Sequence, residues 1–293
     1  MIFRLLPLLL VACGTSNSGT DGGGTDGASD GNTTTMDGGG TTDGGIPATK
    51  YVGVVLVSST NTSTSMRYDI FGTFEQPPTT SSSMNCTITP DGACSFYDCT
   101  NTDAGTSPTP TYLNAGALEV DVGANMIMPM QMANKEYRAV GNMPLFTGGE
   151  MVRAKATGDP MGAPAFDLSV TAPSRITMTQ PTYPPMGGLQ IARTGAYDLK
   201  WTGGTSGKVY ASLATYPTGG YKAVACNVDA SAGGITFPAT SMAKLTAGGG
   251  YLAVSCLSQT YVVQGDWGLI LEAYNTVVES GGRAVTLFSA TVQ

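Results

Sequence analysis

The chain has 293 residues, of which 41% are apolar and only 12% are charged, and it contains 40 glycines. So small a share of Glu, Lys and Arg disfavours long surface helices, whereas abundant glycine suits short strands joined by turns. The absence of histidine excludes Ser-His-Asp and Cys-His catalysis and zinc sites that use imidazole. The net charge is −7 and the sequence has no basic cluster, so nucleic acid is not expected as a partner.

The amino terminus has the layout of a secretory signal. Residues 1–12 read MIFRLLPLLLVA, with Arg4 placed before an apolar run from Leu5 to Ala12, which is the pattern that secretion signals show. Spanning a bilayer takes about 20 helical residues, so this run is too short to be a transmembrane helix.

The end of that run, Leu10-Val11-Ala12-Cys13, resembles the lipobox of bacterial lipoproteins. The resemblance implies transfer of diacylglycerol to the Cys13 sulfur, cleavage after Ala12, and acylation of the new amino group, typically with palmitate. Three acyl chains exceed what stable anchoring to a membrane requires. Gly14 stands where an Asp would favour the inner membrane, so the resemblance implies the outer membrane. The alternative is an ordinary secretory signal in which the cysteine is coincidental.

Residues 14–45 consist almost entirely of Gly, Thr, Asp, Ser and Asn. Such a segment has too little apolar surface to fold, so we expect a disordered stalk after the lipidated cysteine, with a mean reach of about 30 Å. Its Asp-Gly units lack the alternate spacing and the closing Glu of a calcium loop. No metal or cofactor is therefore predicted.

From Ile46 onward, apolar and polar residues alternate with a period of two, which indicates half-buried strands. Residues 51–57 are continuously apolar and suit a strand buried on both faces, and residues 240–245 indicate a helical turn. The fold class is therefore predicted to be all-β, with one or two antiparallel β-sandwich domains after the stalk. The alternating segments are 117–122, 151–156, 166–170, 196–201 and 267–272.

A boundary near Ala172-Pro173 divides the folded part into a β-rich domain, 46–172, and a second domain, 173–293. Residues 174–179, the strand that ends at Trp201, and residues 208–215 resemble an immunoglobulin or fibronectin type III domain. Trp201 precedes both later cysteines, unlike the antibody pattern. Residues 46–172 are either a separate domain or the other half of one larger sandwich.

Five cysteines remain besides Cys13, and an exported protein is expected to oxidise them. Cys226 and Cys256 both point inward by their strand phase, and we predict that they pair with each other. One further disulfide is expected within a local trio, with the partners left open. The trio is Cys86, Cys94 and Cys99.

Three motifs in the folded part are candidate sites. Ser241 and Lys244 match the S-x-x-K pattern of penicillin-binding enzymes, but the partner motifs are missing and the match is interpreted as coincidence. Tyr216 and Tyr221 flank a loop and either stack on a sugar or close the end of the core. Glu119 and Asp121 share one strand face and are candidates for a hydrolytic carboxylate pair.

These observations favour a non-enzymatic lipoprotein of the cell envelope, with a binding, adhesion or structural role. Its lipid would attach it to the membrane, outer rather than inner, and its folded part would lie in the periplasm or outside the cell. The expected partner is an envelope protein or a glycan. Two alternatives remain: an envelope hydrolase that uses a carboxylate pair, and an assembly accessory that offers an open sheet edge to a partner strand.

Overall fold

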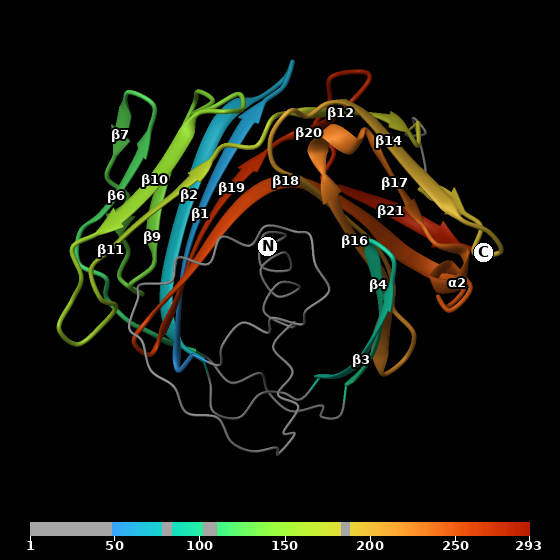
Figure 1. Cartoon of the computed structure of the whole chain (residues 1–293), viewed down its shortest axis with the longest axis horizontal. Coiled ribbons are helices and arrows are strands. Elements are labelled where there is room, and N and C mark those ends of the chain that lie inside the picture. Colours follow the sequence, from blue (N-terminus) through green and yellow to red (C-terminus); the bar gives the residue numbers. More distant parts are fainter. Residues whose placement is uncertain (1–48, 78–83, 102–109, 183–187) are drawn as a thin grey trace, which may run out of the picture.

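The computed structural model describes residues 49–77, 84–101, 110–182 and 188–293 (Figure 1). The predicted signal, the lipidated Cys13 and the stalk through residue 45 lie outside the described residues. Among the described residues, no helix is long and apolar enough to cross a membrane.

A large curved sheet forms an arch along the whole molecule (Figure 1), and its main path runs β3-β4-β16-β15-β18-β19-β1-β2-β9-β8. Strands β5, β13 and β21 attach to this path. The strand bounds are β1 (Tyr51–Asn61), β2 (Met66–Gln76), β3 (Met84–Asp91), β4 (Cys94–Asn101), β5 (Thr111–Tyr112), β8 (Met130–Gln131), β9 (Tyr137–Gly141), β13 (Leu189–Ile191), β15 (Lys208–Thr215), β16 (Gly220–Asp229), β18 (Gly248–Gln264), β19 (Trp267–Asn275) and β21 (Leu287–Val292).

Two four-stranded sheets lie on the outer side of the arch, one at each end (Figure 1). Among the described residues, the one α-helix is the short α2 (Ala239–Met242), which follows β17. The first small sheet has the order β11-β10-β6-β7, with β6 (Leu118–Val122), β7 (Asn125–Ile127), β10 (Met151–Ala156) and β11 (Phe166–Thr171). The second has the order β17-β14-β12-β20, with β12 (Ile176–Gln180), β14 (Tyr197–Gly203), β17 (Gly234–Phe237) and β20 (Val277–Glu279).

Each small sheet encloses a hydrophobic core against the arch. We call the part with β6, β7, β10 and β11 the first body, and the part with β12, β14, β17 and β20 the second body. The first core contains Phe74 and Val152 together with Trp267 of β19. The second contains Trp201 and Phe288 together with Phe96 of β4. Each core therefore takes strands from both sides of residue 172.

This exchange of strands corrects the predicted division into domains 46–172 and 173–293. Residues 267–275 come late in the chain, yet β19 pairs in parallel with β1 in the first body. Residues 94–101 come early, yet β4 pairs with β16 in the second body. Pairing between strands that are distant in sequence leaves no signal in composition or periodicity, so the boundary drawn at Ala172-Pro173 does not separate the two cores.

The prediction of an all-β fold with antiparallel β-sandwich architecture is confirmed. The strands predicted at 151–156 and 166–170 are β10 and β11, and the helical turn predicted at 240–245 overlaps α2. Strand β1 differs in detail, since buried residues alternate with half-buried ones along it. Three pairings, β1 with β19, β12 with β20 and β13 with β21, are parallel rather than antiparallel.

Buried hydrogen bonds at the end of β19 reach the connection between the two bodies. The Asn275 Nδ2 atom donates to the Thr147 carbonyl at 3.1 Å and to the Pro173 carbonyl at 2.9 Å. The Asn275 Oδ1 atom accepts from the Thr276 amide at 2.8 Å. Asn275 is only 5% exposed, so these bonds satisfy the polar atoms of its own buried side chain. One side chain thus ties a loop of the first body to the connection between the bodies.

The cysteine pairing differs from the prediction. Cys86 bonds to Cys99, which is one of the pairs left open within the trio, and Cys94 bonds to Cys226. Cys256 is a buried free thiol, and its burial raises its pKa to about 12.

The predicted Cys226–Cys256 bond is wrong because one strand separates the two residues. Cys226 lies opposite Ala211 and Cys256 lies opposite Val209, so β15 runs between β16 and β18. Two strand spacings amount to about 9.5 Å, beyond the limit of ~7 Å between Cα atoms that a disulfide can bridge. On its other side, β16 places Cys226 directly opposite Cys94. The inward phase of both cysteines was correct, but it does not identify the neighbouring strand.

Candidate functional site

Three tyrosines gather on the second body, where β15, β16 and β18 lie side by side. We call Tyr216, Tyr221 and Tyr251 the tyrosine cluster. The ring centroid of Tyr216 lies 6.4 Å from that of Tyr221 and 6.1 Å from that of Tyr251. Tyr216 is 56% exposed and Tyr251 is 46% exposed. The cluster is therefore an open aromatic surface and not a closed part of the core.

Glycines allow the backbone to hold these rings together. Gly219 has φ +84° in the turn between β15 and β16, a conformation that L side chains rarely adopt. A Cβ at Gly220 would lie 2.0 Å from the Cys99 carbonyl oxygen, and a Cβ at Gly250 would lie 2.2 Å from that of Ala214. These three glycines therefore allow both a tight turn after Tyr216 and a close approach of the neighbouring strands.

The tyrosine cluster has the chemistry of a stacking surface. Partial burial, and then the nearby Tyr251 hydroxyl, raise the pKa of Tyr216, so its phenol stays neutral at physiological pH. Neutral phenol rings offer an apolar face for the C–H side of a sugar and a hydroxyl that exchanges hydrogen bonds. The predicted pair Tyr216 and Tyr221 does come together. The sequence analysis did not include Tyr251 in this pair. Tyr251 reaches the cluster only because the register of β15 and β18 sets it opposite Ala214.

The candidate carboxylate pair lies on the outer face of the first small sheet. The Lys155 Nζ atom bonds to Glu119 at 2.7 Å and to Asp121 at 2.8 Å. The hydrogen bonds to Asp121, and then to Glu119, raise the pKa of Lys155. A glycosidase pair needs one carboxyl group that is protonated and can donate, whereas both of these accept from one ammonium group. The arrangement is an ion-pair ladder across strands and does not favour the hydrolase hypothesis.

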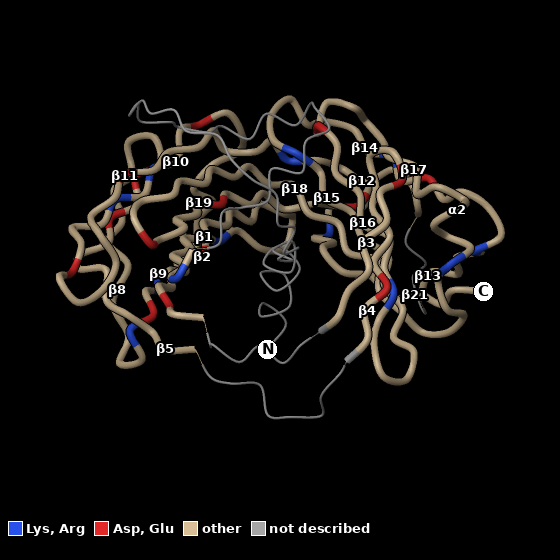
Figure 2. The backbone as a smooth tube through the Cα atoms, turned by 60° about the horizontal axis from the view of Figure 1, so that its bottom comes forward, with Lys and Arg blue, Asp and Glu red and all other residues tan. Residues whose placement is uncertain are grey.

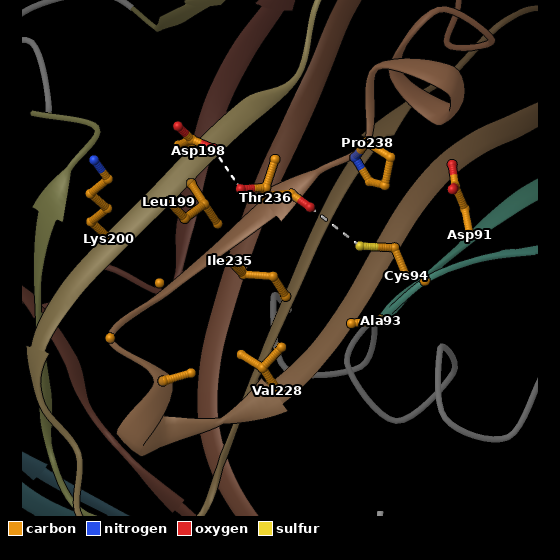
Figure 3. A pocket seen from close by; sticks show the side chains of 14 residues that line it. Asp91, Ala93, Cys94, Asp198, Leu199, Lys200, Val228, Ile235, Thr236 and Pro238 are labelled. Atoms are coloured by element: carbon orange, nitrogen blue, oxygen red, sulfur yellow. Dashed lines mark hydrogen bonds between the residues drawn. The ribbon is translucent and has the colours of Figure 1, made fainter. Parts of the chain in front are cut away.

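A cavity of about 650 Å³ opens on the second body (Figure 3). Asp198 accepts from the Thr236 hydroxyl at 2.6 Å. Asp91 accepts from Ser241 at 2.6 Å and from Thr240 at 2.5 Å, and these bonds lower its pKa. The two acids lie apart in Figure 3, with Thr236 between them. The lining residues are Asp91, Gly92, Ala93, Cys94, Asp198, Leu199, Lys200, Val228, Ala232, Gly233, Gly234, Ile235, Thr236 and Pro238.

Ser241 and Lys244 each contact another side chain of the second body. The Ser241 hydroxyl donates to Asp91, and the Lys244 Nζ atom lies 5.3 Å above the ring centroid of Phe96. Helix α2 ends at Met242, so it offers no extended helical face on which a lysine could activate the serine.

Strand β19 contains a buried carboxyl group that the sequence pattern placed on a polar face. Glu272 is 3% exposed and accepts a hydrogen bond from the Tyr274 hydroxyl. Burial raises the pKa of Glu272, and it also raises that of Tyr274. Glu272 lies between Gln259 of β18 and Leu56 of β1 in the large sheet. No second acidic side chain is opposite it in these two ladders, so the group does not form a carboxylate pair there.

The charged side chains are spread over the two bodies. Figure 2 shows Lys and Arg scattered along the trace with Asp and Glu interspersed. Several of the basic side chains pair with acidic ones, such as Arg153 with Asp167 and Lys208 with Asp229. Among the described residues, no group of three or more Cys, Asp or Glu side chains is arranged to hold a metal ion.

No protein-family model and no curated protein sequence matches this chain. Solved structures with some likeness include a 1.5-MDa bacterial ice-binding adhesin, at 10% identity over 79% of this chain and 66% of that one, with a TM-score of 0.22. A tetra-tandem repeat from the extending region of a large adhesion protein matches at 12% identity over 78% and 74%, with a TM-score of 0.20. The fibronectin(III)-like modules of Clostridium thermocellum CbhA match at 12% identity over 69% and 98%, with a TM-score of 0.17. The TM-scores are too low to support an argument from these likenesses.

Proposed function

We propose that this protein is a lipid-anchored, non-enzymatic binding protein of the cell envelope, and that the tyrosine cluster is its contact surface. The observation that carries the proposal is the packing of three tyrosines, two of them exposed, at the end of β15. Large exposed aromatic surfaces are costly in water and are typical of binding sites. The ligand class that fits is a glycan, whose rings stack on phenols.

The acidic groups support a binding role over a hydrolytic one. Glu119 and Asp121 are held by Lys155, and Asp91 is held by two hydroxyl groups. Each of these carboxylates accepts hydrogen bonds from neighbouring side chains. The two disulfides fit an oxidising compartment, which supports the placement of the folded part outside the cytoplasm.

Replacing Tyr216 and Tyr251 together by alanine is expected to weaken glycan binding about tenfold, since two stacked rings contribute roughly 1 to 3 kcal/mol. The measurement is co-sedimentation with insoluble peptidoglycan, followed by titration with lipopolysaccharide oligosaccharide. The matched control is Leu287→Ala, which removes an exposed apolar side chain of the same body. Tyr216→Phe with Tyr251→Phe should retain most of the binding. Equal binding by the alanine and control variants would contradict the proposal.

The anchor is tested separately through Cys13. We expect Cys13→Ala to move the protein from the membrane fraction to the soluble fraction, because no other lipid attachment is predicted. The control is Cys256→Ala, which removes a buried thiol and should leave the protein in the membrane fraction. Mass spectrometry of the wild-type amino terminus should show a diacylglyceryl thioether. An unmodified terminus, or a Cys13→Ala protein that is still membrane-bound, would overturn the anchor.

A further inference from the structure

Methionine is distributed unevenly between the two bodies. It is an apolar residue that is usually buried, and in the second body Met178 and Met242 are in the core. All the other methionine side chains that the structure describes are exposed, and all belong to residues 66–161. They are Met66, Met126, Met128, Met130, Met132, Met143, Met151 and Met161.

Four of these residues follow one another at every second position. The sequence Met126-Ile-Met-Pro-Met-Gln-Met132 places thioethers at 126, 128, 130 and 132, and we call these four side chains the methionine array. Their exposed fractions are 65%, 56%, 69% and 45%. In an extended chain, residues two apart point to the same side and lie about 7 Å apart. Because a methionine side chain has three flexible bonds, neighbouring sulfurs can converge without a change in the backbone.

The contacts of Gln131 orient the second half of the array. The Gln131 Nε2 atom donates to Asn114 at 2.9 Å and to the Tyr137 hydroxyl at 3.2 Å. Tyr137 is a core residue, so Gln131 faces inward and Met130 and Met132 take the opposite side. In the first half, Met126 lies opposite Asp121, which is on the outer face of its sheet.

The array runs along the edges of two sheets. Strand β7 ends the path of the first small sheet, and β8 ends the path of the large sheet. Among the described residues, no strand pairs with the outer side of either one. Exposed edges are usually protected by charged residues, whereas these two carry thioethers. A ligand in solution therefore has access to all four sulfurs.

We propose that the methionine array binds a monovalent soft cation, Cu(I), through its thioether sulfurs. Thioethers are soft ligands that select Cu(I) over harder divalent ions. The chain has no histidine, so imidazole is not present to favour Cu(II) or Zn(II). Of the cysteines that the structure describes, four form disulfides and Cys256 is buried. The thioethers are therefore the accessible soft donors of the described part, and unlike thiols they do not form disulfides in an oxidising compartment.

The proposal is tested by Cu(I) titration against a chromophoric chelator, with ascorbate as a reductant that leaves the disulfides intact. Every protein carries Cys13→Ala and Cys256→Ala, so that no thiol contributes. We expect a Cu(I) affinity at least tenfold weaker when the four array residues become leucine (M126L, M128L, M130L and M132L). The matched control changes four other exposed methionines of the same body and should bind as tightly as the parent (M66L, M143L, M151L and M161L).

Nuclear magnetic resonance of ¹³C-labelled methionine methyl groups locates the ion independently of any variant. Addition of Cu(I) should shift the array methyl signals and leave those of Met178 and Met242 unchanged, whereas Zn(II) should shift none. Equal loss of affinity in the array and control variants, or shifts spread over all exposed methionines, would show unspecific thioether binding and overturn the proposal. Absence of binding by the parent protein would overturn it as well.

Discussion

Replacing Cys94 and Cys226 together by alanine is expected to lower the free energy of unfolding by about 5 kcal/mol. The bond joins residues 132 positions apart, and the entropy that a cross-link removes from the unfolded chain increases with the length of the closed loop. The same argument gives about 3 kcal/mol for Cys86–Cys99, which closes a separation of 13 residues. Since a folded domain has only about 5–15 kcal/mol in total, the first bond decides whether the second body stays folded. Denaturant unfolding in the absence of reductant measures both differences.

Two controls separate the disulfide from a general effect of cysteine replacement. Cys256→Ala removes a buried thiol without removing a bond, and its cost should be clearly smaller than that of the Cys94 and Cys226 pair. Peptide mapping without reduction should recover the peptides of Cys94 and Cys226 joined together. Recovery of Cys226 linked to Cys256 would contradict the pairing in the structure.

Asn275→Leu is expected to destabilise the protein by about 3 kcal/mol and to make the two bodies unfold in separate steps. Leucine is close to asparagine in size, but it removes the donor to the Thr147 and Pro173 carbonyl groups. The Thr276 amide loses the Asn275 oxygen and keeps the Ser59 carbonyl at 3.2 Å. Each buried polar group without a partner costs roughly 1–3 kcal/mol. The two tryptophans report the two bodies separately, because Trp267 is in the first core and Trp201 in the second.

The measurement is denaturant unfolding followed by fluorescence in variants that keep one tryptophan each, Trp201→Phe or Trp267→Phe. The transitions should coincide in the parent protein and separate when Asn275→Leu is added. Asn227→Leu is the matched control, since Asn227 is exposed on β16 and an exposed substitution changes stability by only about 0.5 kcal/mol. Coincident transitions in the Asn275→Leu protein would show that this residue does not couple the bodies.

Much of the local structure follows from the sequence because burial on one face of a strand enforces alternation. Met151–Ala156 shows this clearly, since Val152 and Ala154 are fully buried while Arg153 points outward to Asp167. The inward phase of Cys226 and Cys256 was also correct, since both are buried. These features depend only on which residues of a strand face the core.

The order of the strands does not follow from the sequence, because the alternation within a strand does not identify the strand that pairs with it. Cys226 illustrates this, as its phase was right and its partner was wrong. Glu272 shows a related limit. Its position in the alternation suggested an exposed face, but β19 lies in the interior of the large sheet and both of its faces are covered.

The tyrosine cluster also has one part that the sequence predicts and one part that depends on strand pairing. Tyr216 and Tyr221 flank one turn and could be predicted as neighbours, whereas Tyr251 joins them through the pairing of β15 with β18. The methionine array needs no tertiary information, since its period of two is visible in the sequence. Its exposure is what the structure adds, because alternating apolar residues usually indicate a buried face.

The position of β1 determines how the molecule would respond to a mechanical load applied through the segment before Tyr51. Strand β1 pairs with β19 from Tyr51 to Ser59 and with β2 from Val52 to Asn61. A force along the axis of such an interior strand shears both ladders together, so that many hydrogen bonds share the tension and rupture at once. A strand at the rim has only one ladder, so fewer hydrogen bonds would share the same force. The segment before Tyr51 therefore enters the large sheet at an interior strand. A pulling force from the amino-terminal side is transmitted to both bodies through that sheet.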